Sequence, residues 1–212
     1  MNILGISCFY HDSAATILQK GLISAAAQEE RFSRIKGDRS FPRYSIAYCL
    51  DEAGLSINDL DYVAFYENPD KSFPRIISTL KIVPNNIFST LNNLKLWGKE
   101  RLNLERYFRH FYPNFKGNFF FANHHLSHAA SAFFPTNFKE AAILTIDGVG
   151  EDCTASISKG ENNKIEILKE MKFPHSLGLL YTTITTFLGF KANSGEYKVM
   201  GLAPYGNPSF YS

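Results

Sequence analysis

The opening of the chain alternates between short apolar runs and polar turns. Residues 2–9, 13–19 and 22–30 have the composition of strands, and polar turns at residues 10–12 and 20–21 separate them. Two tight reversals within about 30 residues predict an antiparallel meander of three strands. This opening does not have the strand–helix–strand pattern of a parallel sheet.

The following segments change from one pattern to another. Residues 31–42 are polar, contain glycine and end in proline, which predicts a loop. Residues 44–53 carry apolar side chains at helical spacing, and Gly54 is a typical residue just past a helix end. Residues 59–67 and 118–123 then have the composition of strands.

A basic, aromatic and Asn-rich stretch lies between these last two strands. It has weak helical periodicity and contains Pro74 and Pro84, so we expect an insertion of helices over residues 69–116. Residues 97–116 combine aromatic and basic side chains, as an RNA-binding surface does. An amphipathic helix explains the same pattern more simply.

Residues 123–134 carry the most distinctive chemistry in the sequence. His124 and His128 are spaced i, i+4, so on a helix they share one face, roughly 5–6 Å apart at Cβ, and both can reach one metal ion. Structural roles for two histidines are equally compatible with this spacing. A metal site also needs a third ligand, and the nearest carboxylates in sequence are Asp147 and Asp152; otherwise that ligand lies beyond Ser212.

A buried-strand pattern follows in residues 141–147, ending on Asp147 and turning at Gly148 and Gly150. Glycine amides at such a turn can cradle a phosphate, and Asp147 can hold a metal-bound water. A plain hairpin turn between two strands is the simpler alternative.

The chain resembles its own opening when the sequence is shifted by 140 residues without a gap. Apolar strands resemble each other easily, so chance is one explanation. The acidic turns also coincide, with Asp12 falling on Asp152, and this favours a duplication. The aligned apolar pairs are Ile3 with Ile143, Leu4 with Leu144, Ile6 with Ile146, Ala15 with Ala155 and Ile17 with Ile157.

A duplication divides the chain into a first lobe, residues 1–138, and the start of a second lobe, residues 139–212. After its three strands the second lobe supplies only a predicted helix over residues 177–190 and a predicted loop over residues 191–206. We therefore expect an incomplete second lobe and an N-terminal portion of a longer protein.

Several polar residues outside the histidine helix are further candidates. His11 and Asp12 place a base beside a carboxylate at a turn, and Lys36 lies in a basic loop that can hold a phosphate or carbamoyl oxygen. Glu196 and Lys198 lie among glycines, which suits the wall of a pocket. Exposed turns and loops also carry such residues without any function.

Composition narrows the class of protein. Of the 212 residues 45% are hydrophobic and 20% charged, as in ordinary globular proteins, and the formal net charge of +2 gives no general attraction to nucleic acid or membranes. The three cysteines lack motif spacing, which favours free thiols. We find no signal peptide and no apolar run of membrane-spanning length, and so expect a cytoplasmic protein.

Five motifs occur in one order along the chain, and together they resemble the carbamoyltransferases of the NodU and cephem hydroxymethyl carbamoyltransferase type. The motifs are LGISCFYHDSAA, QEERFSRIKGDRSFP, NHHLSHAASAFFP, TIDGVGE and SGEYKVMGLAPYG, and the resemblance is weakest over residues 67–117. It implies an α/β fold of the actin-like ATPase (ribonuclease H-like) class with duplicated lobes. The tRNA threonylcarbamoyl transferase is a relative of this class.

The resemblance also implies a reaction. In this family a C-terminal YrdC-like domain makes carbamoyl-adenylate from carbamoyl phosphate and ATP. The N-terminal domain transfers the carbamoyl group to an acceptor hydroxyl on a sugar, antibiotic or related metabolite. The chain stops before such a C-terminal domain, so we expect this portion to be inactive alone.

Site residues follow from the matching motifs. His124 and His128 correspond to metal ligands, with iron(II) the expected ion and a downstream aspartate the expected third ligand. His11 and Asp12 correspond to the acceptor and transfer site, and Lys36 to a carbamoyl or phosphate contact. The residues expected to contact the nucleotide or line its pocket are Asp147, Gly148, Gly150, Glu196 and Lys198.

The chemistry of carbamoyl transfer suits these residue types. The reaction passes through a tetrahedral oxyanion, so it needs a Lewis acid at the carbonyl oxygen and a base, here His11, at the attacking hydroxyl. Three alternatives stay open: a tRNA threonylcarbamoyl transferase, a sugar-kinase-like phosphotransferase and a non-catalytic nucleotide-binding fragment. The HHLSH string argues against the first, and a kinase has no need of two histidines.

Overall fold

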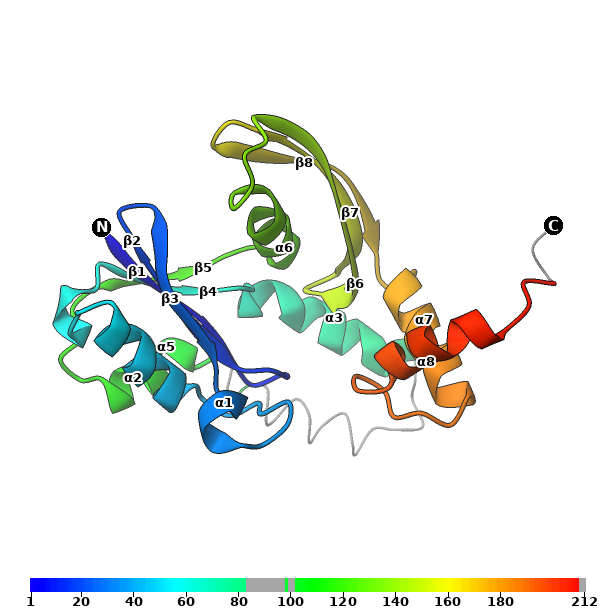
Figure 1. Cartoon of the computed structure of the whole chain (residues 1–212), viewed down its shortest axis with the longest axis horizontal. Coiled ribbons are helices and arrows are strands. Elements are labelled where there is room, and N and C mark those ends of the chain that lie inside the picture. The colour runs from blue at the N-terminus through cyan, green and yellow to red at the C-terminus, as the bar shows by residue number, and fades with distance from the viewer. Residues whose placement is uncertain (83–97, 99–101, 210–212) are drawn as a thin grey trace. The chain divides into compact units, whose positions relative to one another are not determined.

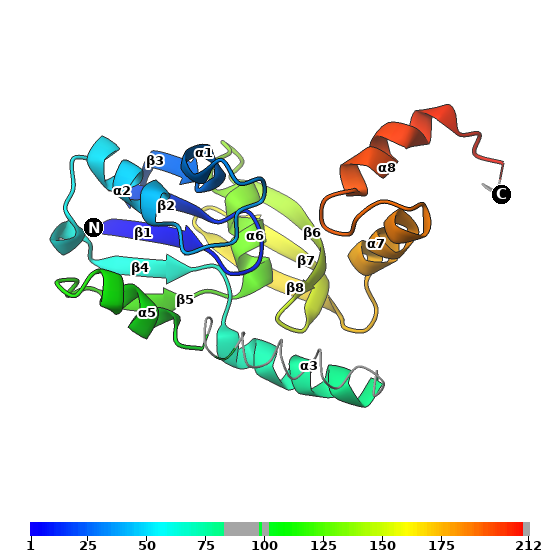
Figure 2. The same ribbon diagram turned by 90° about the horizontal axis from the view of Figure 1, so that it is seen from below.

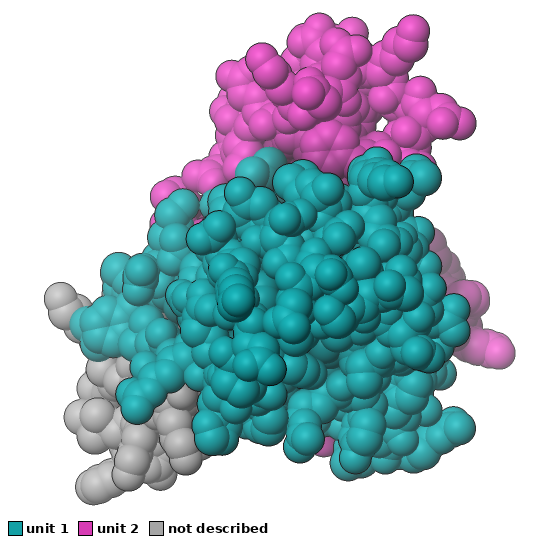
Figure 3. Space-filling view, turned by 90° about the vertical axis from the view of Figure 1, so that its left-hand side faces the viewer, with its two compact units in different colours: residues 1–127 teal, residues 128–212 magenta. Residues whose placement is uncertain are grey.

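The structure is a computed structural model that describes residues 1–82, 98 and 102–209. The chain divides into two compact units, Met1–Ser127 and His128–Ser212 (Figure 3). Each unit has its own sheet, and the two are described in turn.

The first unit contains a five-stranded mixed sheet in the order β3-β2-β1-β4-β5 (Figure 2). Strands β1 (Asn2–Ser7), β2 (Ala14–Gln19) and β3 (Leu22–Gln28) form the predicted antiparallel meander. Strands β4 (Tyr62–Phe65) and β5 (Asn118–Phe121) run parallel to β1. This mixed sheet with helices confirms the α/β class that the motifs implied.

Helices cover one face of this sheet, and α2 (Arg43–Glu52) and α5 (Leu104–Phe111) lie side by side on it (Figure 1). Alternate residues along β1, β2 and β4 point into the same core, as expected for strands with one covered face. The largest buried members of this core are Leu4, Ile17, Ile46, Val63, Phe65, Leu104 and Phe108. The helix α5 is therefore amphipathic, as the simpler interpretation of this stretch predicted.

The helical insertion is present in the described residues as α3 (Pro69–Ile82) and α5, and Pro74 lies within α3. The part of the predicted insertion that contains Pro84 lies outside the described residues. The predicted loop over residues 31–42 is wrong at its start, because residues 31–33 belong to a one-turn helix, α1 (Glu30–Ser33). Glu30 stabilises this segment by accepting a hydrogen bond from the Gly37 amide at 2.8 Å.

Glu29 ties the end of the meander to α2. Its carboxylate is buried and accepts hydrogen bonds from the backbone amides of Tyr44 and Ser45 and from the Ser45 hydroxyl. These amides lie in the first turn of α2, where backbone donors have no partner within the helix. Glu29 therefore caps α2 from another element. A short 3-10 helix, η1 (Ile57–Asp59), leads from α2 to β4.

The second unit contains an antiparallel sheet of β6 (Glu140–Gly150), β7 (Cys153–Glu161) and β8 (Lys164–Lys172). It is followed by α7 (Leu177–Phe187) and α8 (Glu196–Leu202), and a short 3-10 helix, η3 (Ala203–Tyr205), extends α8.

The histidine helix, α6 (His124–Phe133), begins in the last residues of the first unit and continues into the second. Its second half packs on one face of the β6–β7 sheet, where Ala129, Phe133 and Ile143 form a small core. The ring of Phe133 lies over Gly160, because a Cβ on that glycine would come within 2.8 Å of the ring. This contact holds α6 against the sheet. The predicted end of the helix before Pro135 is confirmed.

Two predicted boundaries in the second unit are wrong. Strand β6 does not end at Asp147 but continues to Gly150, which pairs with Cys153 across a two-residue turn whose first residue, Glu151, has a φ of 57°. The predicted loop over residues 191–206 contains α8 and η3. The Glu196 carboxylate accepts the amides of Asn193 and Gly195, and these hydrogen bonds hold the turn that leads into α8.

The two meanders share a register under the 140-residue shift. Leu4 pairs with Ile17 between β1 and β2, and Leu144 pairs with Ile157 between β6 and β7. The pairing with the third strand is shifted directly after Ile17 in one unit and directly after Ile157 in the other. Equivalent residues therefore occupy equivalent places in the two sheets.

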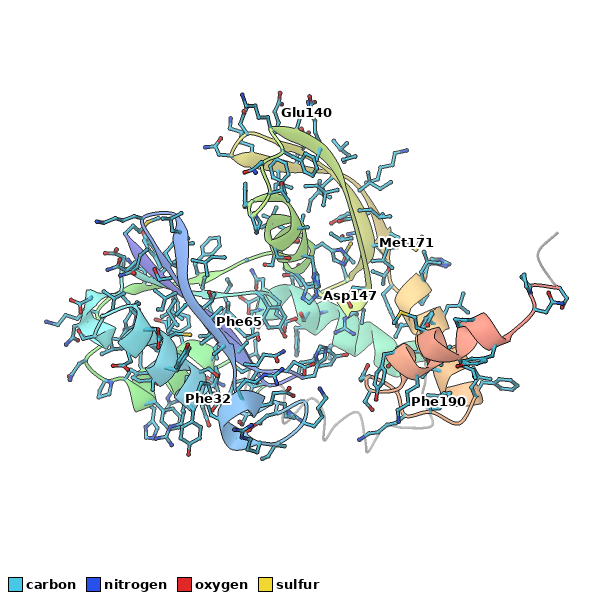
Figure 4. All side chains as sticks on the ribbon, viewed as in Figure 1. Phe32, Phe65, Glu140, Asp147, Met171 and Phe190 are labelled. Atoms are coloured by element: carbon cyan, nitrogen blue, oxygen red, sulfur yellow. The ribbon has the colours of Figure 1, made fainter. Side chains whose placement is uncertain are left out.

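Their burial differs. Leu4 and Ile17 are fully buried beneath helices, whereas Leu144 is 65% exposed and Ile157 is 47% exposed. Met171, which shares this face through its pairing with Ala155, is 40% exposed and lies on the side of the sheet away from α6 (Figure 4). The second sheet thus has an open apolar face at the positions that form the core of the first.

The three cysteines, Cys8, Cys49 and Cys153, are buried thiols, and no disulfide joins them. In the described part of the chain, no helix has both the length and the apolar character needed to cross a membrane.

Candidate functional site

The site begins at the carboxyl ends of two neighbouring parallel strands. Phe65 and Phe121 are paired at the ends of β4 and β5, and the amide of Ala122 donates to the carbonyl of Phe65 at 2.9 Å. The residues that follow these strands therefore meet at one edge of the sheet. Glu67 follows β4 and His124 follows β5, and in α/β sheets this edge is where functional groups collect.

The start of α6 is fixed by side chains. Asn123 accepts a hydrogen bond from the amide of Leu126 through its side-chain oxygen, as an N-cap residue does. Ser127 donates to the carbonyl of Tyr66 at 3.0 Å, and the rings of Tyr66 and His124 make an edge contact with centroids 5.3 Å apart. These contacts hold the first turn of α6, including His124, against the loop after β4.

The predicted histidine pair lies on one helix, so its geometry follows from the helix itself. His124 and His128 are one turn apart on α6, and the helix continues across the boundary between the two units. The side chain of His124 is 12% exposed and that of His128 is 52% exposed. His125, the histidine between them, is fully buried and points into the interior.

Asp147 on β6 supplies a carboxylate to this pair. Its Oδ2 lies 3.5 Å from Nε2 of His128, and one ligand atom from each of His124, His128 and Asp147 lies within 4.8 Å of the others. Among the residues that the structure describes, this is the one group of histidine, cysteine and acidic side chains with metal-binding spacing. Two imidazoles and one carboxylate with open positions are typical of a non-haem iron(II) site.

The turn into α7 holds Asp147 in place. The Ser176 hydroxyl contacts the carbonyl oxygens of Asp147 and Gly148 at 3.2 and 2.7 Å, and it accepts the amide of Leu179 as the N-cap of α7. Gly178 packs directly on this backbone, since a Cβ there would lie 2.4 Å from the Asp147 carbonyl oxygen. Asp147 is labelled in Figure 4, near the end of β6 that leads to Gly150.

Asp152, the other carboxylate considered as a third ligand, is placed elsewhere. It forms an ion pair with Lys172 at 2.9 Å, and this hydrogen-bonded carboxylate raises the pKa of Lys172. Asp152 is not part of the histidine group. Of the two candidates nearest in sequence, only Asp147 joins the cluster.

His11 and Asp12 lie together in the turn after β1. Nδ1 of His11 is 2.8 Å from Oδ2 of Asp12, and both side chains are about half exposed. Asp12 has a φ of 47°, a conformation that L residues rarely adopt, so the turn is held by its surroundings. Backbone hydrogen bonds from Phe9 and Ser13 to the loop over residues 38–39 provide that support.

The same loop carries Lys36. Its Nζ is 3.8 Å from the Glu30 carboxylate, and its side chain is 92% exposed. Gly37 lies beside the acidic turn, because a Cβ there would be 3.9 Å from Oδ1 of Asp12. The first unit thus brings the loops of His11, Asp12 and Lys36 together, although these residues are far apart in sequence.

The predicted nucleotide-contact residues are divided between β6 and α8. Gly148 and Gly150 lie within β6, and the Gly148 amide donates to the side chain of Asp147 at 2.6 Å. Neither glycine has a positive φ, and both lie in the strand, so the tight turn predicted at Gly148 and Gly150 does not form. Glu196 and Lys198 lie in the first turn of α8.

The Glu196 carboxylate is engaged within its own unit. Burial raises its pKa, but the hydrogen bonds from Asn193, Gly195 and Thr182 outweigh this, so that the pKa of Glu196 lies below its ordinary value. Nζ of Lys198 is 5.9 Å from the centroid of the Tyr197 ring.

Glu67 is the residue at this site that the sequence did not single out. Its Oε2 lies 3.7 Å from Nδ1 of His124, and its side chain is 5% exposed. The available signal was its place as the last residue of a predicted strand, with His124 directly after the next predicted strand.

Comparison with known proteins supplies an independent line of information. A family model described as the carbamoyltransferase N-terminus matches residues 2–211. An uncharacterized protein of Synechocystis is 48% identical over 99% of this chain and 35% of its own length. The nodulation protein NolNO of Sinorhizobium fredii is 37% identical over 95% of this chain and 28% of its own length.

Among solved structures, YeaZ from Pseudomonas aeruginosa matches with a TM-score of 0.40 and 13% identity, over 82% of this chain and 67% of that one. The chain spans about a third of the length of the two sequence relatives named above.

Proposed function

Because this chain belongs to the carbamoyltransferase N-terminus family, we propose that it is the transfer portion of an ATP-dependent O-carbamoyltransferase. The proposed reaction moves a carbamoyl group from carbamoyl-adenylate to an acceptor hydroxyl of a small molecule such as a sugar or antibiotic. The observation that carries the proposal is the His124, His128 and Asp147 group, which lies within motifs that match the family.

The proposal includes a longer protein. The relatives are about three times as long as this chain, which leaves room for a YrdC-like domain that makes carbamoyl-adenylate from carbamoyl phosphate and ATP. The two lobes proposed here are residues 1–138 and the start of a second lobe in residues 139–212. The shared register of the two meanders supports this division, and the open apolar face of the second sheet fits a lobe that lacks part of its cover.

His124, His128 and Asp147 would hold the metal ion. A Lewis acid bound there would polarise the carbamoyl carbonyl and stabilise negative charge on its oxygen. Iron(II) is the ion proposed, because two histidines and one carboxylate with open positions suit it. We assign the carboxylate ligand to Asp147, whereas the family resemblance led us to expect an aspartate beyond Ser212.

His11 is the proposed base for the acceptor hydroxyl. Asp12 lies against its Nδ1 and orients the ring, so that Nε2 is the atom that takes the proton. Lys36 is exposed and cationic, and we assign it to the carbamoyl or phosphate oxygens. Asp147, Gly148, Gly150, Glu196 and Lys198 are the proposed contacts on the nucleotide side, and the proposed location is the cytoplasm.

The proposal is tested with the full-length protein that carries this sequence. Full-length protein should transfer a carbamoyl group from carbamoyl phosphate and ATP to an acceptor, and His11→Asn should abolish transfer while carbamoyl-adenylate still forms. Loss of both steps would argue against a role for His11 in transfer. Absence of both activities from the unchanged full-length protein would argue against the proposed function as a whole.

A further inference from the structure

We infer that Glu67 is a positioning residue for the metal site: its carboxylate accepts the Nδ1 proton of His124 and so directs Nε2 of that ring to the metal. The inference rests on the metal site proposed above and assigns a role to a residue outside the ligand group. It starts from the 3.7 Å separation between Oε2 of Glu67 and Nδ1 of His124.

The fold brings these two residues together for a topological reason. Glu67 lies two residues past the end of β4, and His124 lies three residues past the end of β5. The two strands are parallel neighbours, and their last residues pair with each other. The sheet therefore delivers a carboxylate and an imidazole to the same edge, although they are far apart in sequence.

Burial indicates that the contact is more than an accident of the surface. The Glu67 side chain is 5% exposed and that of His124 is 12% exposed. A carboxylate withdrawn from water costs free energy unless it gains hydrogen bonds or an opposite charge. Tyr66 also makes an edge contact with the His124 ring, with centroids 5.3 Å apart, so a second side chain restrains the imidazole.

The chemistry of metal-bound histidine explains why a carboxylate suits this place. A ligating imidazole almost always donates its second N–H to a carboxylate, carbonyl or water, which fixes the tautomer and makes the ligand nitrogen more basic. A separation of 3.7 Å is longer than a hydrogen bond, so the inference requires this distance to shorten when metal binds.

Zn²⁺ binding provides a direct test, because zinc accepts histidine and carboxylate ligands and has no redox chemistry. The affinity of the 212-residue chain would be measured by competition with a chromophoric chelator, for unchanged protein and for Glu67→Gln. We expect Glu67→Gln to weaken Zn²⁺ binding roughly 10–100-fold, the usual effect of losing such a partner.

Glu29→Gln is the matched control, since it removes the charge of another buried carboxylate of the same unit. This change should lower the melting temperature by weakening the cap of α2, yet leave Zn²⁺ affinity within about twofold, because Glu29 contacts Tyr44 and Ser45 rather than a ligand. Equal losses of affinity in both variants would show a general effect of stability and overturn the assignment.

A second measurement does not depend on the variant folding. In ¹⁵N-labelled unchanged protein, NMR should show His124 protonated at Nδ1 and bound to zinc through Nε2. Binding through Nδ1, or wild-type affinity in Glu67→Gln, would overturn the role of Glu67 while leaving the metal site standing. Failure of the unchanged chain to bind Zn²⁺ would instead remove the metal site and this inference with it.

Discussion

Nε2 of His128 lies 3.5 Å from Oδ2 of Asp147, so the histidine helix and β6 contact each other near the end of the strand. This distance is longer than that of an ordinary hydrogen bond, and it is compatible with two ligands of one metal ion. A metal ion between them would replace this long contact by two metal–ligand bonds. Their proximity therefore predicts metal-dependent stability.

The first prediction concerns Asp147 as a proposed metal ligand. Asp147→Asn should weaken Zn²⁺ binding by more than about 10-fold, because loss of an outer hydrogen-bond partner already costs 10–100-fold and this change removes a ligand charge. Isothermal titration of the 212-residue chain measures the effect. His175→Ala is the control, since His175 is exposed and outside the group of proposed ligands. An unchanged Zn²⁺ affinity in Asp147→Asn would exclude Asp147 as a ligand.

Metal should also stabilise the folded chain. A ligand that binds only the native state raises the free energy of unfolding by about 2.7 kcal/mol when its free concentration is 100 times its dissociation constant. Thermal unfolding with and without Zn²⁺ should therefore show a higher melting temperature with metal, and the double variant His124→Ala/His128→Ala should lose the increase. An equal increase in that variant would place zinc elsewhere.

Gly178 gives a prediction about the support of Asp147. Gly178→Ala adds a Cβ at 2.4 Å from the Asp147 carbonyl oxygen, so β6 or α7 must shift. Overpacking of this kind costs about 1–3 kcal/mol, and we expect both lower stability and weaker Zn²⁺ binding. Denaturant unfolding gives the first quantity and the chelator assay the second.

Gly201→Ala is its matched control, because a Cβ at Gly201 meets nothing within 4 Å and the residue also lies in a helix, α8. Alanine is a better helix residue than glycine by roughly 0.8–1.0 kcal/mol, so this change should leave stability equal or higher. If both variants behave alike, close packing at Gly178 does not support the site.

Local pattern was sufficient to predict much of this molecule. The meander, the histidine helix and the shared helix face of His124 and His128 all follow from the spacing of residues along the sequence. What the sequence left open depends on contacts between distant segments. Asp147 and Asp152 were equivalent candidates by order along the chain. The pairing of Cys153 with Lys172 between β7 and β8 brings Lys172 to Asp152, whereas Asp147 lies against His128.

The missed features have the same origin. Glu67 is recognised only when β4 and β5 are known to be parallel neighbours. The strand end at Gly150, rather than Asp147, depends on cross-strand pairing that outweighs the turn preference of two glycines. The turn that leads into α8 is held by a hydrogen bond from the Asn193 amide to the Glu196 carboxylate.

Cys153 gives a prediction about pH. Burial raises the pKa of this thiol to about 11 from 9.0, so it stays protonated in the folded chain where it would ionise in the unfolded chain. A raised pKa stabilises the folded state below pH 9.0, and this contribution is lost as the pH rises from 9.0 to about 11.

The difference in unfolding free energy between unchanged protein and Cys153→Ala should therefore shrink by an amount on the order of 2 kcal/mol over that interval. Denaturant unfolding at pH 8 and at pH 11 measures it. A difference that stays constant with pH would mean that the thiol is not protected. Below pH 8 the buried thiol should also react slowly with thiol reagents, because the thiolate is the nucleophile.

The last prediction concerns the open face of the second sheet. Leu144 and Ile157 are equivalent in register to Leu4 and Ile17, yet they are exposed where their counterparts are buried. If a segment of the longer protein covers this face, Leu144→Ala should cost about 2–5 kcal/mol there, as for a buried leucine, and much less in the 212-residue chain. Leu22→Ala, at a position that is 74% exposed in β3, should cost little in both proteins. The measurement is the free energy of unfolding of each variant, in the 212-residue chain and in the longer protein. An equally small loss of stability for Leu144→Ala in both proteins would mean that the face stays open, because truncating a leucine is strongly destabilising only where the side chain is buried.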